Sequence, residues 1–441
     1  MTVMLAMSAI ATQAQADVSI MNNDMGDVSV YGILDAAVVT QNHSLSISSS
    51  LPNQIYPYQP TSATYAGNSV TGLLGGGLSD SRLGIKGGLN VGDGAKAIFN
   101  LESGFDLPSG QLNNAAATVA ANSGNAAQQH NTVNADSSLN GQLFGRAAWV
   151  GINDDDLGRL TMGLQNNPMK DVFASYDPVK SDTFSPFGES GAVGGGGAIS
   201  EDARMQNSVE YTKNFGSGFT AVAAYQFGNN SSSNGIEGST GVGNGYALRF
   251  GYEQQAFGLQ AVYNKFTDAI KVVNSGVVGD IALKAYNTES YLFAGKYKPM
   301  VDLTLEAGWE NYKLSAPSDA TLNAPQSIFG YTVSATTAGL PNGVSQSTNI
   351  YFIGGDYNFT PKINVALGYY DTEVDAQTGS TNSGSIKTVS AILTYHVYKS
   401  LDGYLVASTN EFSGVNFGFT AAGSTNNSTN TAYGMGGRFK F

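Results

Sequence analysis

Cysteine is absent from this chain, and charged residues are scarce. Without cysteine, disulfide frameworks, thiolate metal sites and cysteine nucleophiles are all excluded. Only 12% of the 441 residues are Asp, Glu, Lys or Arg, whereas soluble domains usually contain about 25%. No apolar run reaches the roughly 18 residues that a membrane-spanning helix needs. These absences argue against a soluble enzyme of this size and against a helical membrane protein.

Basic residues are the scarcer of the two charged classes, with 21 Lys and Arg against 34 Asp and Glu and a net charge of −13. Binding to nucleic acid depends on a basic face that neutralises phosphates. We therefore expect no nucleic-acid partner.

Glycine and aromatic residues are plentiful, with 55 Gly, 23 Tyr and 21 Phe. They accompany segments such as residues 27–40 (DVSVYGILDAAVVT), in which apolar and polar side chains alternate as they do in β-strands. The pattern recurs along the chain and never changes to a helical period. Only every second side chain of a transmembrane barrel meets lipid, so such a chain need not look hydrophobic. A soluble β-sandwich could alternate in the same way.

The connections between these segments separate the two alternatives, because short and long ones alternate strictly. Outer-membrane barrels sort their loops in this way, into tight periplasmic turns and longer external loops, whereas a sandwich has no reason to do so. We predict an all-β fold, a transmembrane antiparallel β-barrel of about sixteen strands, in the size range that leaves an aqueous channel. The short connections lie near residues 90–94, 153–158, 212–218, 253–257, 298–300, 358–362 and 397–402, and the long ones cover 41–80, 107–143, 166–203, 228–244, 267–280, 313–346, 374–385 and 410–430.

One long connection, residues 166–203, follows two strand-like runs joined by a turn at residues 153–158. Its length of roughly forty residues is unusual for a loop and indicates a functional or disordered segment. It is rich in charged residues, and a strand that begins with Arg204 follows it. We expect this segment to fold into a hollow interior.

The first 16 residues resemble a cleaved export signal. A short apolar core precedes the small-residue pattern Ala14-Gln-Ala16, and we expect cleavage before Asp17. The positively charged start of such signals is missing, since the first basic residue is Arg82. Residues 17–441 are then expected to form a single barrel domain.

The chain as a whole resembles the Gram-negative general porins, in particular the betaproteobacterial branch. This resemblance implies a sixteen-stranded barrel, a homotrimer and a third external loop, here residues 166–203, that folds inward to narrow the pore. It also implies that the last strand, with Tyr433, Met435, Phe439 and Phe441, is a signal for the barrel assembly machinery. The segments that carry the resemblance are VYGILD (30–35), SRLGIKG (81–87), AKAIFNLESGF (95–105), GRAAWVG (145–151), GRLTMG (158–163), NSVEY (207–211) and the terminal Phe441.

The sequence departs from the family at one wall position. The family usually has Arg after the glycine that matches Gly163, but Leu164 and Gln165 stand here. One wall cation is therefore missing, so the ion preference is not carried over.

The expected constriction combines cations on the lumen wall with acids on the inward loop, and opposed rows of charge set ion selectivity by sign. For any one of these residues, lining the pore and anchoring the loop are both open roles. For Glu201 and Asp202, anchoring or a place at the mouth is the better interpretation. The cations are Arg82, Lys86, Lys96, Arg146, Arg204 and Arg249, and the acids are Asp171, Asp177, Asp182, Glu189, Glu201 and Asp202.

We predict no catalytic residue, no metal and no cofactor. His43 and His130 fall in polar connections, and His396 falls in a strand-like segment with Ser390 and Thr394 on the same face. A hydrolase would need such a pair oriented by a third polar group, but a polar residue that fills the lumen is the simpler interpretation. Calcium at residues 154–156 is conceivable, although a solvated turn explains that run of Asp more simply.

We therefore expect a passive outer-membrane channel of a Gram-negative bacterium, through which ions and small hydrophilic solutes diffuse. Its other expected partners are outer-membrane lipid and lipopolysaccharide. A substrate-selective porin and a plugged surface or adhesin barrel are the alternatives. A plugged barrel would need extra apolar side chains facing inward, and the inward sets identified from the alternation are mostly polar or small.

Overall fold

The computed structural model describes most of the chain. The described residues are 17–42, 58–60, 69–92, 94–108, 110–112, 129–131, 143–180, 184–187, 204–228, 244–274, 280–318, 327–328, 331–338, 340–381, 383–414 and 429–441. The predicted signal at residues 1–16 lies outside these ranges, as does part of the predicted inward loop.

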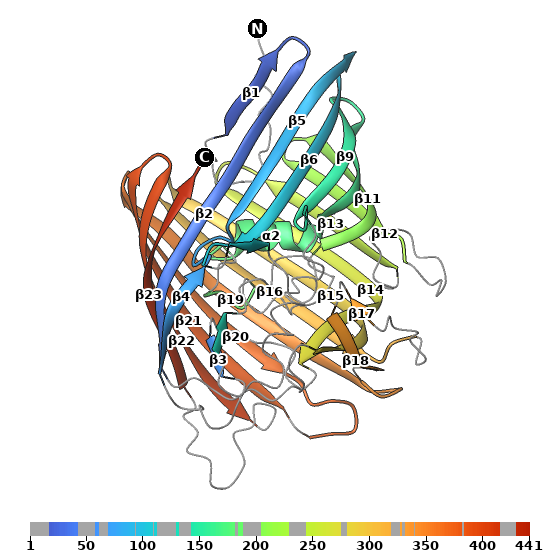
Figure 1. The fold of residues 1–441 in the computed structure, drawn as a ribbon, viewed down its shortest axis with the longest axis vertical. Coiled ribbons are helices and arrows are strands. Elements are labelled where there is room, and N and C mark those ends of the chain that lie inside the picture. Colours follow the sequence, from blue (N-terminus) through green and yellow to red (C-terminus); the bar gives the residue numbers. More distant parts are fainter. Residues whose placement is uncertain are drawn as a thin grey trace.

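Sixteen antiparallel strands form a closed barrel, which confirms the predicted fold class (Figure 1). The ring closes where Ile33 to Asn42 of the first barrel strand pair with Lys440 to Thr431 of the last. In ring order the strands are β2 (Gly26–Asn42), β5 (Arg82–Gly92), β6 (Ala95–Asp106), β9 (Ala147–Asp154), β10 (Gly158–Asn166), β11 (Arg204–Gly216), β12 (Phe219–Gln226), β13 (Gly245–Glu253), β14 (Phe257–Asn274), β15 (Asp280–Met300), β16 (Leu303–Ser315), β19 (Ser345–Thr360), β20 (Ile363–Val374), β21 (Gly384–Tyr398), β22 (Leu401–Gly414) and β23 (Thr429–Lys440).

The two ends of the barrel differ as the connection lengths predicted. At one end, turns of two or three residues join β5 to β6, β9 to β10 and the later hairpins. The C-terminal Phe441 lies there, as does β1 (Val18–Asn23), which is paired to β2 (Figure 1). The long connections leave from the other end, which is therefore the external one.

The external connections contain some strand of their own. The predicted connection 267–280 is largely a hairpin extension, because β14 continues to Asn274 and β15 starts at Asp280. Between β16 and β19, β17 (Ser327–Ile328) pairs with β18 (Tyr331–Ala338), which runs parallel to β15. The other short elements are β3 (Tyr58–Pro60), β4 (Val70–Gly75), β7 (Gln111–Leu112) and β8 (Gln129–Asn131).

Side chains alternate between an outer and an inner face, as expected. On β21 the outward Val389 and Leu393 are 47% and 40% exposed, whereas the inward Thr388 and Ser390 are fully buried. The lipid-facing side is therefore apolar and the inner side largely polar, because each face meets a different environment.

Part of the predicted inward loop lies inside the barrel (Figure 1). Its helix α2 (Pro168–Tyr176) starts at Asn167, whose side chain accepts the backbone N–H of Met169, and has proline in its first turn. The helix contacts β13, β14 and β15. None of the helices in the described part of the chain has the length and apolar character to span a membrane.

An apolar core lies between this loop and one side of the ring, and the alternation did not predict it. Phe173 of α2 stacks on Phe187 with ring centroids 4.2 Å apart, and Phe187 contacts Phe352 and Tyr370 edge to face at 5.3 and 6.0 Å. The inner face was expected to be mostly polar or small, but on β19–β22 it is apolar where the loop covers it. The inward residues there are Ile350, Phe352, Tyr370, Ile392 and Val406.

Candidate pore constriction

The segment after α2 is tied to the inner wall by polar contacts. Asp177 ends the helix, is fully buried, and accepts a hydrogen bond from the hydroxyl of Tyr370 on β20. Farther along, the hydroxyl of Ser390 on β21 donates to the backbone carbonyl of Phe184. These two contacts hold residues 177–180 and 184–187 along the wall, so Asp177 is placed as an anchor of the loop.

Lys180 adds an ionic anchor between these two points. Its ammonium group pairs with Glu306 on β16 and lies 3.5 Å from Asp356 on β19. Burial alone would lower the pKa of the Lys180 ammonium, but the neighbouring Glu306 and Asp356 carboxylates raise that pKa above its usual value. Lys180 is therefore charged at neutral pH and compensates the fully buried Glu306 side chain.

The C-terminal turn of α2 is fixed by Tyr176. Its hydroxyl donates to Glu253, which pairs with Lys296, and the Lys296 ammonium lies 4.6 Å from the centre of the Tyr176 ring. Burial is the main cause of the raised pKa of the Tyr176 hydroxyl. The same hydroxyl accepts from Gln260, 3.0 Å away, and Gln260 accepts from Arg249 at 2.8 Å. Arg249, a predicted wall cation, is thus linked to the loop.

Across the ring, β5, β6 and the start of β9 present a basic group. Arg146 is 5% exposed and pairs with Glu102 at 2.6 Å and Asp80 at 3.0 Å. Glu102 also accepts from Tyr31 at 2.8 Å and interacts electrostatically with Arg82. The structure thus brings Arg82 and Arg146 together around one carboxylate.

Lys86 extends this wall toward the periplasmic end. Its ammonium group lies 4.7 Å from the ring centre of Tyr31 and 2.7 Å from Asp17. Lys96 is 3.6 Å from Asp27, and both side chains are well exposed. Lys96 is therefore set apart from the Arg146 cluster.

A short inward bulge, residues 76–81 between β4 and β5, positions Asp80 beside Arg146. The buried Asp35 carboxylate accepts the backbone N–H groups of Gly77, Leu78 and Ser79 at 3.0–3.1 Å, together with the hydroxyl of Tyr404. Three backbone donors on one carboxylate fix the bulge. Sequence reasoning missed this role of Asp35, although an acid within the otherwise apolar run 33–39 was an available signal.

The wall formed by β10 and β11, the two strands that flank the loop, contains one predicted cation and one ion pair that was not predicted. Arg204 starts β11 opposite Asn166 and is 5% exposed. Arg159, not predicted, lies 3.2 Å from the buried Glu210. Where the family's arginine would stand, Gln165 accepts from Thr161 at 2.6 Å and donates to Ser208 at 3.1 Å. A buried amide network thus joins β10 and β11 here.

The predicted acidic row is described only in part. Asp171 lies in the first turn of α2 and accepts from the side chain of Asn166 at 2.9 Å. Four members lie outside the described residues, so the acidic side of the constriction stays a prediction. They are Asp182, Glu189, Glu201 and Asp202.

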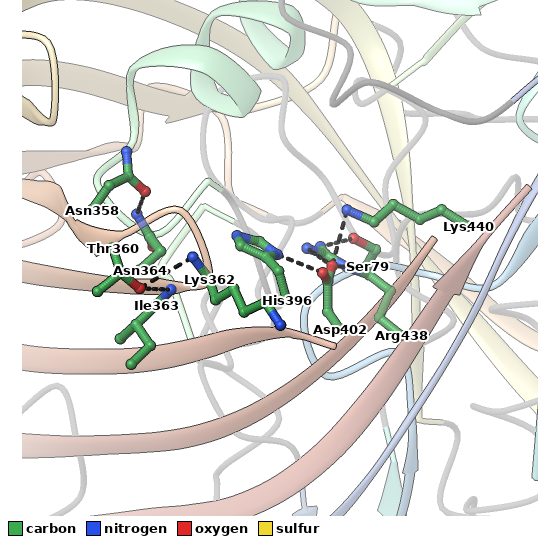
Figure 2. A network of polar contacts seen from close by, with 10 residues as sticks. All are labelled: Ser79, Asn358, Thr360, Lys362, Ile363, Asn364, His396, Asp402, Arg438 and Lys440. Carbon is green, nitrogen blue, oxygen red and sulfur yellow. Dashed lines mark hydrogen bonds and ion pairs between the residues drawn. The ribbon is translucent and has the colours of Figure 1, made fainter. Parts of the chain in front are cut away.

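A second polar network surrounds Asp402 near the periplasmic end (Figure 2). His396, Arg438 and Lys440 lie 2.7, 2.9 and 2.9 Å from its carboxylate, and Arg438 also donates to Ser79 at 3.0 Å. His396 is therefore paired with Asp402, while Ser390 is bonded to the loop, so the two do not form a hydrolase pair in this arrangement. His43 and the side chain of His130 lie outside the described residues.

The two remaining predicted features are at the surface. Asp154 accepts the backbone N–H groups of Asp156 and Leu157 at 2.9 and 2.7 Å, as in a capped turn. On the last strand, Tyr433, Met435 and Phe439 are 48%, 63% and 42% exposed on the outer face. The terminal Phe441 exchanges backbone hydrogen bonds with Gly32, and its role in assembly stays a prediction.

Comparison with known proteins gives one consistent match. The Gram-negative porin family matches residues 2–415 of the chain. An outer membrane porin protein of Bordetella pertussis is 28% identical over 225 residues, which is 51% of this chain and 46% of that relative. The chain thus matches less than half of the relative's length.

Two solved structures share the fold. The anion-selective porin from Comamonas acidovorans has a TM-score of 0.59 at 19% identity, covering 94% of this chain and 100% of that chain. The trimer form of OmpT from Vibrio cholerae has a TM-score of 0.55 at 17% identity, covering 95% and 100%. At these identities the similarity establishes the architecture alone.

Proposed function

Because this chain belongs to the Gram-negative porin family, whose members lie in the outer membrane, we propose that it forms a water-filled channel for passive diffusion. Ions and small hydrophilic solutes would cross it down their gradients. The observation that carries the proposal is the anchored loop, residues 168–180 and 184–187, on one side of a closed barrel, with the Arg82–Arg146 cluster on strands across the ring from it. Fixed charges on facing walls select solutes by charge and polarity.

A plugged barrel and an enzyme are less well supported than a passive channel. The inward apolar residues pack beneath residues 168–180 and 184–187 along one side of the ring, so they support a loop held against the wall better than a filled lumen. In the described part of the chain, titratable side chains that come together, such as Arg146 with Glu102, form ion pairs that position each other. We therefore infer a channel without catalysis.

Single-channel recording in planar bilayers tests this function. The full chain, refolded in detergent and shown by circular dichroism to be β-rich, should give stable ohmic steps. A salt gradient then gives the ion preference from the reversal potential. The control is the same sample unfolded by boiling, which should be silent. Absence of conductance from the verified folded protein would overturn the proposal.

We further propose that the channel assembles as a homotrimer through the outer face of β2, β5, β9 and β10. On these strands the exposed large hydrophobic side chains are aliphatic or methionine, whereas β12–β15 and β19–β21 carry exposed Tyr or Phe. Aromatic rings mark barrel faces that meet the membrane interfaces, so their absence supports contact with another subunit. A trimer form is also known for the V. cholerae OmpT of similar fold.

Two matched substitutions test this surface. Val150 and Ile353 face outward on β9 and β19 and are 62% and 60% exposed. Val150→Trp should convert the trimer to monomers in light scattering of the detergent-solubilised protein, because the ring would block the interface. Ile353→Trp should leave the trimer intact. Equal behaviour of the two variants would refute the assignment of the interface.

Barrel assembly machinery and lipopolysaccharide are proposed partners on the same basis. The alternating last strand with its exposed Phe439 supports the former. Deletion of the terminal Phe441 should lower the amount of folded protein in outer-membrane fractions while leaving refolding in detergent unchanged. Loss of refolding in detergent would instead indicate a structural role.

A further inference from the structure

A row of three charged residues crosses the outer face of the barrel near its external end. Lys265 on β14 lies opposite Glu289 on β15, which lies opposite Lys313 on β16. The row shares the outward face with Tyr291 and Phe293, which are 40% and 54% exposed. It therefore faces the membrane side of the barrel and not the lumen.

On β14 and β15 this row lies one outward-facing position closer to the external end than a belt of tyrosines. Tyr246, Tyr263 and Tyr291 are neighbours on β13–β15, with ring centroids 5.8 and 4.9 Å apart. Such rings sit at the level of the lipid headgroups. Charged groups just beyond them, toward the long loops, are at the level of the outer-leaflet headgroups.

The carboxylate of this row is satisfied by tyrosines. Glu289 accepts from the hydroxyls of Tyr263 at 2.7 Å and Tyr291 at 3.1 Å. Lys265 and Lys313 act on Glu289 electrostatically, but within the described part of the chain neither lysine forms a direct ion pair with a carboxylate. The two ammonium groups thus remain able to bind another anion.

We infer that Lys265 and Lys313 bind a phosphate group of an outer-leaflet glycolipid of the lipid A class. Strand spacing places the two lysine stems about 10 Å apart, and their flexible four-carbon chains can converge on one tetrahedral anion. The row carries one net positive charge, which complements a phosphate at headgroup depth. This inference rests on the proposed function, because it needs the chain in the outer membrane.

A second row on the same outer face provides an internal comparison. Asp371 on β20 lies opposite Lys387 on β21, which lies opposite Glu411 on β22. Asp371 follows the outward Tyr369 as Lys265 follows Tyr263, so both rows lie one position beyond a tyrosine. This row has one lysine between two acids and a net negative charge, so it should repel phosphate.

The test measures binding of purified diphosphoryl lipid A to the detergent-solubilised full-length protein by native mass spectrometry. Lys265→Gln and Lys313→Gln should each weaken binding about fivefold, and together about 25-fold, as expected for loss of one charge contact each. Lys387→Gln is the matched control and should not weaken binding. Lys265→Arg with Lys313→Arg should retain it. Thermal unfolding of each variant verifies that the barrel has folded.

Three outcomes would overturn the inference. They are unchanged binding by the double glutamine variant, an equal loss in Lys387→Gln, and equal affinity for dephosphorylated lipid A. Full displacement of bound lipid A by millimolar inorganic phosphate would be a fourth such outcome, because it would indicate a site for free phosphate and not for a lipid. Conductance of the same variants in planar bilayers is measured separately, so a channel that conducts without binding lipid A would refute this site and leave the proposed function intact.

Discussion

Replacement of Lys180 by Met should release residues 177–180 and 184–187 from the inner wall. Glu306 would then be a buried carboxylate with Asp356 close by and no cation to compensate it, since Lys180 is its ionic partner. Breaking a buried ion pair costs about 3–5 kcal/mol. The Lys180 side chain is 33% exposed, so solvent screening reduces the expected cost to about 2–3 kcal/mol.

Open-channel current noise measures this effect, because a loop that leaves the wall alters the width of the pore while the barrel stays folded. A loss of about 2–3 kcal/mol of docking energy raises the undocked population by roughly 30- to 160-fold, so Lys180→Met should show frequent partial closures. The matched variant is Lys180→Met combined with Glu306→Gln. It removes the buried charge together with its partner and should recover much of the quiet state.

The comparison of single and double variants decides the argument. If both are equally noisy, Glu306 is not the group that Lys180 compensates. If the single variant is as quiet as the wild type, the ionic anchor contributes nothing and the apolar core alone seats the loop.

Three further predictions concern the two sides of the constriction. Phe187→Ala should lower the free energy of unfolding by about 3–5 kcal/mol in urea titrations of detergent-folded protein, whereas an effect below 1 kcal/mol would show that the aromatic contacts do not seat the loop. Arg146→Gln should shift the reversal potential in a salt gradient toward cations, because it leaves Glu102 without its closest cation; an unchanged potential would place this pair outside the ion path. The pKa of Lys180 is raised, so its contribution is complete below the unfolded value of about 10.4 and is lost only as pH rises through the higher folded pKa. Current noise should accordingly be constant from pH 8 to 10 in the wild type, where the carboxylates that face Lys180 are ionised, and a Lys180-dependent change within that window would contradict the ionic anchor.

The alternation of side chains was sufficient to predict the barrel and the inward direction of its cations. A period of two leaves each strand only two possible orientations, and lipid fixes which face is apolar. Arg82, Lys86 and Arg249 could therefore be assigned to the inner face without knowing any contact. The sorting of loops by length separately identified the two ends of the barrel, because periplasmic turns are short and external loops are long.

The seat of the loop could not be predicted in this way. Residues 350–353 (IYFI) are apolar on both faces of β19, a pattern typical of strands that are covered on both sides. Lipid covers the outer face, but the sequence does not show that residues of the loop, such as Phe187, cover the inner one. The continuous apolar run was the available signal, and alternation elsewhere obscured it.

The polar contacts that anchor the loop and the bulge could not be predicted either, because they join residues far apart in the chain. Asp35 and Tyr404 are separated by 369 positions, and Asp177 and Tyr370 by 193. Each acid looks like an ordinary lumen residue until its partner is known. Asp177 was accordingly predicted to line the pore or to anchor the loop, and only the closed ring, with α2 in it, shows where its carboxylate points.

These distant anchors imply an order of folding. Asp177, Lys180 and Phe184 contact side chains of β16, β19, β20 and β21. These strands all come later in the sequence, and contacts of such separation form late because loop closure must come first. Until β13–β20 have assembled, the apolar face of α2 has no wall to cover it and is open to proteolysis. Pulse proteolysis during refolding should show cleavage within residues 168–187 disappearing together with formation of the compact, heat-modifiable barrel. Protection of this segment before the barrel forms would refute the order, since it would mean that the loop acquires its structure without the strands that hold it.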